Sequence, residues 1–354
     1  MTRVLHVVEH RQDYQTLRSV ECLLRGLGEG FQTAVRTIGP GGNCRSIVVA
    51  IRWLRQENRF DVVHAWGTTA LTAAALGTKT RMVYAPPVLM RPPDLRWLRA
   101  VMAYRDLQVV CPTGTMQRAM VRAGVALQRC HVIRPGVDSS RINRRKDATL
   151  RTQLGFVPDD YVLLGVGEST PAASHHDAVW ATEILHVLDP RYKLLLWGRG
   201  TQIRAVKAFA RQVTSSDLLH VAEERLPQSA DFEQLLAAAD MILNTATGSV
   251  ATLPLAICMA AALPIVSTVT YAARELLEDH HTAILVPRHS PRLIAQRVLE
   301  LREDAALQWK ISDNCRAEAY QFHPLTGFLD QYRAMYRQNV ESAPVEPPIQ
   351  SVRA

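Results

Sequence analysis

The segment from residue 238 to residue 287 decides the fold class. It reads Ala-Ala-Asp-Met-Ile-Leu-Asn over 238–244, Thr-Gly-Ser-Val-Ala-Thr-Leu-Pro-Leu-Ala-Ile-Cys-Met-Ala over 247–260, Leu-Pro-Ile-Val-Ser over 263–267 and Ile-Leu-Val-Pro over 284–287. The short apolar runs at 241–244 and 264–267 predict buried strands. Leu253-Pro254-Leu255 predicts a helix with proline in its first turn. Strand, helix and strand in this order are typical of a parallel α/β sheet.

The same alternation runs through the whole chain of 354 residues. The first part is expected to contain strands at 4–8, 32–38, 60–64, 82–85 and 107–110, and helices at 14–27, 46–57 and 115–123. The second part is expected to contain further strands at 161–167, 192–198 and 218–221, and helices at 291–302, 305–322 and 332–340. Two consecutive α/β units of this kind predict two Rossmann-like domains that face each other across a cleft.

The composition excludes several classes of protein. Hydrophobic residues make up 47% of the chain and charged residues 21%, as in soluble globular proteins. The six cysteines form no close pair, which excludes zinc ribbons and redox motifs of the Cys-x-x-Cys type. No apolar run approaches the roughly 18 residues of a membrane span, and the first residues do not have the pattern of a signal peptide. We therefore expect a cytoplasmic protein, either free or held peripherally at the inner face of the membrane.

Positive charge is concentrated in the first part of the chain. Residues 1–150 contain 23 Lys and Arg against 10 Asp and Glu, whereas residues 151–354 contain 18 against 23. A basic half attracts anionic partners, which could be a membrane surface or a phosphate-bearing acceptor. No nucleic-acid-binding motif is present, so we expect no nucleic acid partner. The alternative is an arginine-rich surface that only contacts solvent.

The segment at 238–287 resembles family 4 glycosyltransferases, which are retaining enzymes of the two-domain GT-B type. His-Val-Ile-Arg-Pro-Gly-Val-Asp at 131–138 is similar to the phrase that ends the first domain of that family. The resemblance implies an acceptor-side domain over 1–140 and a nucleotide-sugar-side domain over 141–322. It also implies a helix over 323–340 that packs back on the first domain. The proline-containing end, 341–354, is expected to be a disordered tail.

Four positions depart from the donor site that the resemblance implies. The arginine and lysine that hold the diphosphate in that family fall at Glu168 and Ala173, and its two glutamates fall at Ser249 and Ile257. A carboxylate at the first position would repel a diphosphate, and isoleucine cannot accept a hydrogen bond from a ribose hydroxyl. The loss of one charge-assisted contact costs roughly 1.5–3 kcal/mol. Donor binding therefore needs replacement contacts.

The remaining donor-site candidates follow the strands of the second domain. Thr247 and Gly248 could present N–H groups to an anion, or could belong to an ordinary helix start capped near Thr252. Arg199, together with Arg225 and Arg274, is a candidate replacement cation. His175 and His176 are interpreted either as partly charged phosphate ligands or, preferably, as surface residues at a helix start. The full set of donor-binding candidates is Gly167, Gly198, Arg199, Thr247, Gly248, Ser249, Leu253 and Glu275, the last of which matches a glutamate of the family.

Acceptor-side candidates lie in the first domain. His64 keeps the first histidine of a paired motif in the family and is either an acceptor contact or a packed residue at a strand end. Arg96 and Trp97 belong to an arginine-rich stretch at 91–99, which either meets a membrane-presented acceptor or packs on the domain with its arginines in solvent. We expect no metal and no cofactor.

Two functions of different classes remain open. One is a sugar transferase that uses a nucleotide-sugar donor with retention. The other is a catalytically inactive GT-B protein that binds a protein partner or acts as a scaffold. A third reading, a nucleotide-sugar epimerase, lacks the acidic and histidine groups it would need. The transferase predicts at least two cations in the cleft beside Gly167 and Gly248, whereas the inactive protein predicts a cleft that is acidic or filled.

Overall fold

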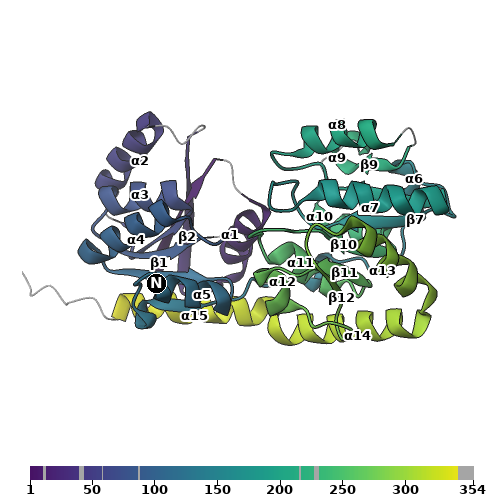
Figure 1. Ribbon diagram of the computed structural model, residues 1–354. Helices are drawn as coiled ribbons and strands as arrows, with labels where there is room; N and C mark the ends of the chain where they lie inside the picture. Colours follow the sequence, from purple (N-terminus) through teal and green to yellow (C-terminus); the bar gives the residue numbers. More distant parts are fainter. Residues whose placement is uncertain are drawn as a thin grey trace, which may run out of the picture.

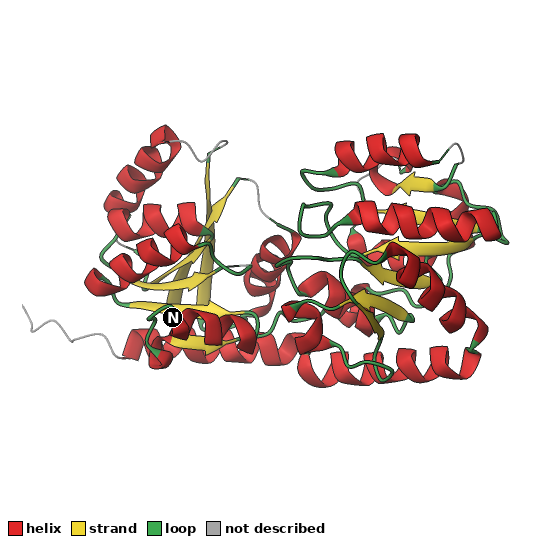
Figure 2. Ribbon diagram, viewed as in Figure 1, coloured by secondary structure: helices red, strands yellow, loops and turns green. Residues whose placement is uncertain are grey.

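Two parallel six-stranded sheets lie side by side, each covered by helices (Figures 1 and 2). The computed structural model describes residues 1–10, 13–39, 44–57, 59–86, 88–214, 217–226 and 231–341. The α/β architecture with two Rossmann-like units is therefore confirmed. The expected disordered tail lies, apart from residue 341, outside the described residues. The exact domain boundaries stay a prediction.

The first sheet has the strand order β2-β1-β3-β4-β5-β6, and all its pairings are parallel. Its strands are β1 (Thr2–Glu9), β2 (Phe31–Ile38), β3 (Val62–Trp66), β4 (Arg81–Ala85), β5 (Leu107–Cys111) and β6 (Cys130–Val132). Its helices are α1 (Tyr14–Gly26), α2 (Cys44–Gln56), α3 (Thr68–Gly77), α4 (Pro92–Tyr104) and α5 (Gly114–Arg122). Side chains alternate between two cores, one under α2 to α5 and one under α1, as in a sheet that is buried on both faces.

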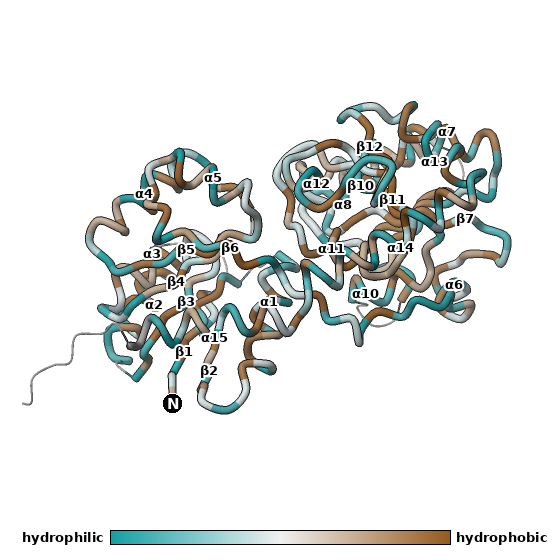
Figure 3. The backbone as a smooth tube through the Cα atoms, turned by 90° about the horizontal axis from the view of Figure 1, so that it is seen from below, coloured by the Kyte–Doolittle hydropathy of each residue, from teal (hydrophilic) through white to brown (hydrophobic). Residues whose placement is uncertain are grey.

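The second sheet has the order β12-β11-β10-β7-β8-β9 and is also parallel. Its strands are β7 (Tyr161–Gly165), β8 (Tyr192–Leu196), β9 (Leu219–Val221), β10 (Met241–Asn244), β11 (Ile265–Thr268) and β12 (Ile284–Val286). Its helices are α6 (Ala148–Gln153), α7 (His175–Leu188), α8 (Ile203–Val213), α9 (Ala222–Arg225), α10 (Phe232–Leu235), α11 (Leu253–Ala260), α12 (Tyr271–Leu276), α13 (Pro291–Glu303) and α14 (Ala305–Phe322). Every residue of β10 is buried, which explains why Met241, Ile242 and Leu243 form an apolar run; Figure 3 colours the backbone by hydropathy.

The last helix, α15 (Leu325–Glu341), returns to the first half of the molecule (Figure 1). It begins seven residues before the helix expected at 332–340. Phe328, Tyr332 and Tyr336 are buried in the same core as side chains of β1, β3 and α1. The backbone N–H of Val137 donates to the carbonyl of His323 over 2.8 Å, which fixes the point where the chain crosses back.

Two histidines are fully buried beneath this helix. His6 of β1 and His64 of β3 are register partners, and their ring centroids lie 5.4 Å apart. Trp66 donates its indole N–H to Nδ1 of His6 over 3.2 Å, and the Tyr336 hydroxyl lies 2.7 Å from Nδ1 of His64. Burial lowers the pKa of His6 to about 3 and holds the pKa of His64 well below its usual value. Both rings are therefore neutral in the folded protein at neutral pH.

The free energy of unfolding is expected to fall as the pH is lowered from 7.5 to 5.5. Unfolded histidine binds a proton near pH 6.5, whereas folded His6 and His64 do not, so each loses about 1 kcal/mol of stabilisation by pH 5.5. Urea unfolding at the two pH values measures the loss. In the His6→Gln variant the glutamine can still accept the indole N–H of Trp66 but does not titrate. The loss of unfolding free energy between pH 7.5 and pH 5.5 should therefore be smaller by about 1 kcal/mol, the contribution of one histidine. His280→Asn, at an exposed position, should change nothing. An unchanged pH dependence in His6→Gln would contradict this account.

Candidate functional site

The strand orders locate the ligand crevice. The order reverses between β1 and β3 in the first sheet and between β7 and β10 in the second. In open parallel sheets, ligands bind outside the carboxyl ends of the strands at such a switch point. Helix α1 follows the carboxyl end of β1 and lies between the two halves (Figure 1). The loops that follow β7, β8 and β10 approach it from the other side.

The loop after β7 is bonded to the loops after β8 and β10. Ser169 donates its N–H to the carbonyl of Arg199 over 2.7 Å, and Thr247 donates its N–H to the carbonyl of Ala172 over 2.8 Å. Gly200 has a φ of +112° and abuts the Ser169 backbone so closely that a Cβ atom would not fit. These three loops therefore form one continuous edge of the crevice, which carries Gly167, Gly198 and Gly248.

His175 begins α7, as expected, but the prediction of a surface position is wrong. Its ring is buried, with Nδ1 2.7 Å from the Ser169 hydroxyl and Nε2 3.2 Å from the carbonyl of Val166. Burial lowers the pKa of His175 to about 4, so it is neutral at pH 7. Its contacts fix the loop after β7. His176 packs its ring against Phe209 instead.

Two carboxylates face each other across the crevice. Glu168 Oε2 accepts from the backbone N–H of Tyr14 over 3.4 Å, and Asp13 caps α1 by accepting from the N–H of Thr16 over 3.0 Å. Burial raises the pKa of Glu168 and the charge of Asp13 raises it further, whereas the hydrogen bond from the Tyr14 N–H and the charge of Arg199 partly oppose this effect. Burial likewise raises the pKa of Asp13. The charge on this pair is therefore unfavourable in the closed crevice.

Arg199, the leading candidate for a replacement cation, is already engaged with the second half. Its Nε lies 2.8 Å from Oε1 of Glu223, and its guanidinium lies 4.7 Å from the ring centroid of Trp197. Arg225 lies behind this loop, 3.6 Å from a carboxylate oxygen of Asp217. Arg274 is exposed on α12.

The amino terminus of α11 is occupied by a side chain from the other half. The amide oxygen of Gln15 accepts from the backbone N–H of Thr252 over 2.9 Å and from that of Leu253 over 3.0 Å. The expected anion nest at Thr247 and Gly248 is also engaged, because both N–H groups point to the carbonyl of Ala172, at 2.8 and 3.4 Å. These four N–H groups therefore have protein acceptors.

The first turns of α3 and α5 also donate backbone N–H groups to side chains at the crevice. Glu275 of α12 accepts from the N–H groups of Gly114 and Thr115 at the start of α5, over 2.5 and 2.8 Å. These bonds outweigh the effect of burial and hold the pKa of Glu275 below its usual value. Glu9, at the end of β1, accepts from the N–H of Thr69 in the first turn of α3 over 2.8 Å. Glu275 therefore links the two halves.

The other substituted positions also have structural contacts. The Ser249 hydroxyl accepts from the backbone N–H of Leu89 over 3.1 Å, which adds a second link between the halves. Ala173 is buried within the loop after β7, and Ile257 is buried on α11. The structure places Leu253 in the first turn of the same helix.

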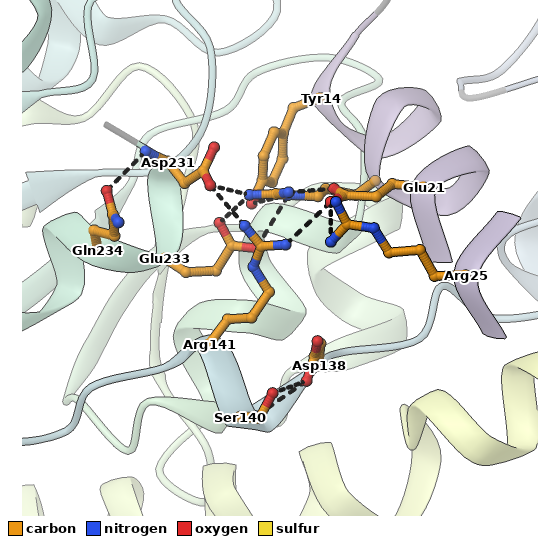
Figure 4. A network of polar contacts seen from close by, with 10 residues as sticks. Tyr14, Glu21, Arg25, Asp138, Ser140, Arg141, Asp231, Glu233 and Gln234 are labelled. Carbon is orange, nitrogen blue, oxygen red and sulfur yellow. Dashed lines mark hydrogen bonds and ion pairs between the residues drawn. The ribbon is translucent and has the colours of Figure 1, made fainter. Parts of the chain in front are cut away.

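Beside the crevice, α1 is joined to the second half by a network of ion pairs (Figure 4). Arg18 lies 2.6 Å from an Asp231 oxygen and 3.3 Å from a Glu233 oxygen. Arg141, in the turn Ser139–Arg141, lies 2.7 Å from Asp231 and 3.3 Å from Glu21. Burial disfavours the charged forms of Asp231 and Glu21. The neighbouring arginines outweigh this effect and hold the pKa of both carboxyl groups below their usual values.

The acceptor-side candidates are not brought together. His64 is fully buried against Trp66 and Tyr336, with no surface open to a ligand. Arg96 is exposed on α4, and Trp97 is half-buried on the same helix. Sequence reasoning missed Asp13, Gln15 and Arg18. The Asp13-x-x-Thr16 spacing signals a helix cap, but no local pattern marks the partner of Gln15.

Two Rossmann-like halves whose strand carboxyl ends meet at a common crevice define the GT-B class of fold. Two family models match the chain, "Glycosyl transferases group 1" over residues 161–304 and "Glycosyltransferase Family 4" over residues 35–141. A search of curated protein sequences found no match. Both matches are to glycosyltransferase families, so the chain is family 4-like in these two regions, and its fold is that of GT-B glycosyltransferases.

Solved structures agree with this fold. HepE from Anabaena, crystallised with UDP and glucose, has a TM-score of 0.80 and 16% identity, over 96% of this chain and 100% of that chain. Sucrose-phosphate synthase from Thermosynechococcus elongatus has a TM-score of 0.80 and 14% identity, over 97% and 100%. A glycosyltransferase from Rickettsia africae has a TM-score of 0.78 and 14% identity, over 97% and 99%.

In the described part of the chain, none of the helices combines the length and the apolar character needed to cross a membrane. Within the same residues, no three His, Cys, Asp or Glu side chains lie together in a way that could hold a metal ion.

Glu168→Gln is expected to stabilise the protein at pH 7 by about 0.5 kcal/mol, a value that allows for solvent screening of a half-buried group. The raised pKa of Glu168 means that its charge is unfavourable in the folded state, so removing the charge helps where the carboxyl is ionised. The gain should disappear near pH 3.5, where the carboxyl is protonated in both folded and unfolded states. Urea unfolding at both pH values measures this.

Glu300→Gln is the matched control for this prediction. Glu300 is paired with Arg297 on α13, and this pairing lowers its pKa, so its removal should not stabilise the protein. Destabilisation of the Glu168→Gln variant at pH 7 would show that the Asp13–Glu168 repulsion does not control the crevice.

Proposed function

We propose that the chain is a glycosyltransferase-like protein that binds a nucleotide sugar in the crevice and transfers the sugar, with retention, to an acceptor held by the first half. The observation that carries this proposal is the continuous edge formed by the loops after β7, β8 and β10, at the switch point of the second sheet. Support also comes from the family match. HepE, which shares the fold, was crystallised with UDP and with UDP-glucose.

In this proposal each half has its own task. Gly167, Gly198 and Gly248 let a diphosphate approach the loop backbones, and Arg199 supplies positive charge once a phosphate competes for it with Glu223. The first half carries the excess of positive charge, and Arg96 on α4 is exposed. This charge suits a phosphate-bearing acceptor or an acceptor presented at an anionic membrane surface.

A specific observation favours a second candidate, an inactive GT-B protein that binds a protein partner. The crevice is acidic at Asp13 and Glu168, and Gln15 occupies the amino terminus of α11. This matches the pattern expected for a protein that has kept the fold and changed its role. The two candidates differ in whether any nucleotide binds.

Titration calorimetry with UDP, GDP, ADP and UDP-glucose tests the proposed function. One nucleotide is expected to bind saturably, and Arg199→Ala should weaken its binding at least tenfold, because a charge-assisted contact contributes roughly 1.5–3 kcal/mol. Arg316→Ala removes an exposed arginine of α14 that pairs with Asp313, so it is the matched control and should bind like the wild type.

Release of the same nucleotide diphosphate from its sugar conjugate, measured with candidate acceptors, would extend the result from binding to transfer. If no nucleotide binds at millimolar concentration, either to the wild type or to a Tyr14→Ala/Gln15→Ala variant that uncovers the amino terminus of α11, the transferase has no donor and the second candidate is favoured.

A further inference from the structure

The first turn of α1 occupies part of the crevice that belongs to the second half. The ring of Tyr14 is buried in the core of the second half, with its centroid 4.8 Å from that of Trp197 and 6.1 Å from that of Phe232. The next residue, Gln15, bonds the first N–H groups of α11. A helix of one half therefore fills an aromatic slot and a helix amino terminus of the other.

These two contacts have the chemistry of a bound ligand. The slot takes a planar ring in edge-to-face geometry, and the amino terminus of α11 takes an oxygen and favours negative charge. A nucleoside diphosphate has both a planar ring and anionic oxygens. We propose that α1 is an internal ligand that closes the crevice, and that a nucleoside diphosphate binds the second half only after α1 has withdrawn. This inference rests on the proposed function.

The docked position of α1 is specified by charge as well as by packing. The Arg18 side chain is only 11% exposed and lies between Asp231, Glu233 and the Tyr14 hydroxyl, which is 3.3 Å from its Nε. Glu233 is also almost fully buried, with 6% of its side chain exposed. A buried ion pair loses much of its stabilisation when one partner is removed, because the other charge stays buried. Loss of Arg18 therefore loosens α1 specifically.

Repulsion between two carboxyl groups opposes the docking of α1. A closure of the crevice that is reversible requires such an opposing interaction. When α1 docks, Asp13 at its cap faces Glu168 on the loop after β7, and both carboxyl groups have raised pKa values. Asp13 moves with α1, because it is bonded to the N–H and the hydroxyl of Thr16 in the first turn of that helix. Withdrawal of α1 therefore relieves the repulsion and frees the N–H groups of Thr252 and Leu253.

Hydrogen exchange of the Thr252 and Leu253 amides in the full chain tests the docking without any nucleotide. Gln15→Ala removes the acceptor of both N–H groups, and these amides should exchange at least tenfold faster in that variant than in the wild type. Leu17→Ala, on the exposed side of α1, is the control and should leave their exchange unchanged. Exchange that is equally fast in the wild type and in Gln15→Ala would overturn the inference.

Calorimetry with UDP, GDP and ADP tests whether α1 competes with nucleotide. The apparent affinity of a site scales with the fraction of molecules in which it is open, so Tyr14→Ala/Gln15→Ala should bind one of these nucleotides at least tenfold more tightly than Leu17→Ala. Arg18→Gln leaves the buried ring in place and provides the same test if the double variant does not fold.

The outcomes separate the inference from the proposed function. Faster amide exchange with tighter nucleotide binding supports both. Faster amide exchange with no nucleotide bound by any variant supports α1 as the closing element and overturns the nucleotide-sugar function. Equal nucleotide affinity in the wild type and the loosened variants overturns the inference that α1 competes for the site.

Discussion

Helices α1, α3, α5 and α11 begin at the crevice, and the N–H groups of their first turns need acceptors there. Side chains supply them: Glu168 for α1, Glu9 for α3, Glu275 for α5 and Gln15 for α11. Three of these four acceptors come from the opposite half of the molecule. The bonds that satisfy the helix ends therefore also fix how the halves face each other. A helix end that is satisfied in this way cannot bind a phosphate at the same time, which couples the arrangement of the halves to the availability of the crevice.

The four residues that depart from the family pattern all have structural contacts: the two polar residues bond the halves together, and the two apolar residues are buried. Glu168 accepts from the N–H of Tyr14, and Ser249 accepts from the N–H of Leu89, so both polar substitutions make contacts between the halves. Ala173 and Ile257 are buried. Glu168 and Ser249 therefore join the halves through hydrogen bonds, whereas Ala173 and Ile257 contribute to the packed interior of the second half.

Apolar periodicity predicted every strand except the two short edge strands β6 and β12, because parallel strands buried on two faces need continuous apolar runs. Helix α3 was missed because Thr-Thr-Ala-Leu-Thr-Ala-Ala-Ala-Leu-Gly at 68–77 has no polar face that would show a helical period. The crevice was far less predictable. Gln15 meets Thr252 across 237 positions of sequence, and no local pattern encodes that contact. The burial of His175 likewise depends on a neighbouring loop, whereas its place at a helix start could be predicted.

The charge of the crevice depends on where α1 lies and not only on which residues occupy the donor-side loops. In the docked state, Asp13 adds its charge to that of Glu168, and the amino terminus of α11 is covered. In the proposed open state, Asp13 leaves with α1, Glu168 keeps the opposing charge of Arg199, and two backbone donors become available. One movement therefore changes the crevice from one that repels a diphosphate to one that offers it a helix amino terminus. A comparison of single residues with the cations of a family cannot detect this change, because the responsible side chains lie on α1 and not on the donor-side loops.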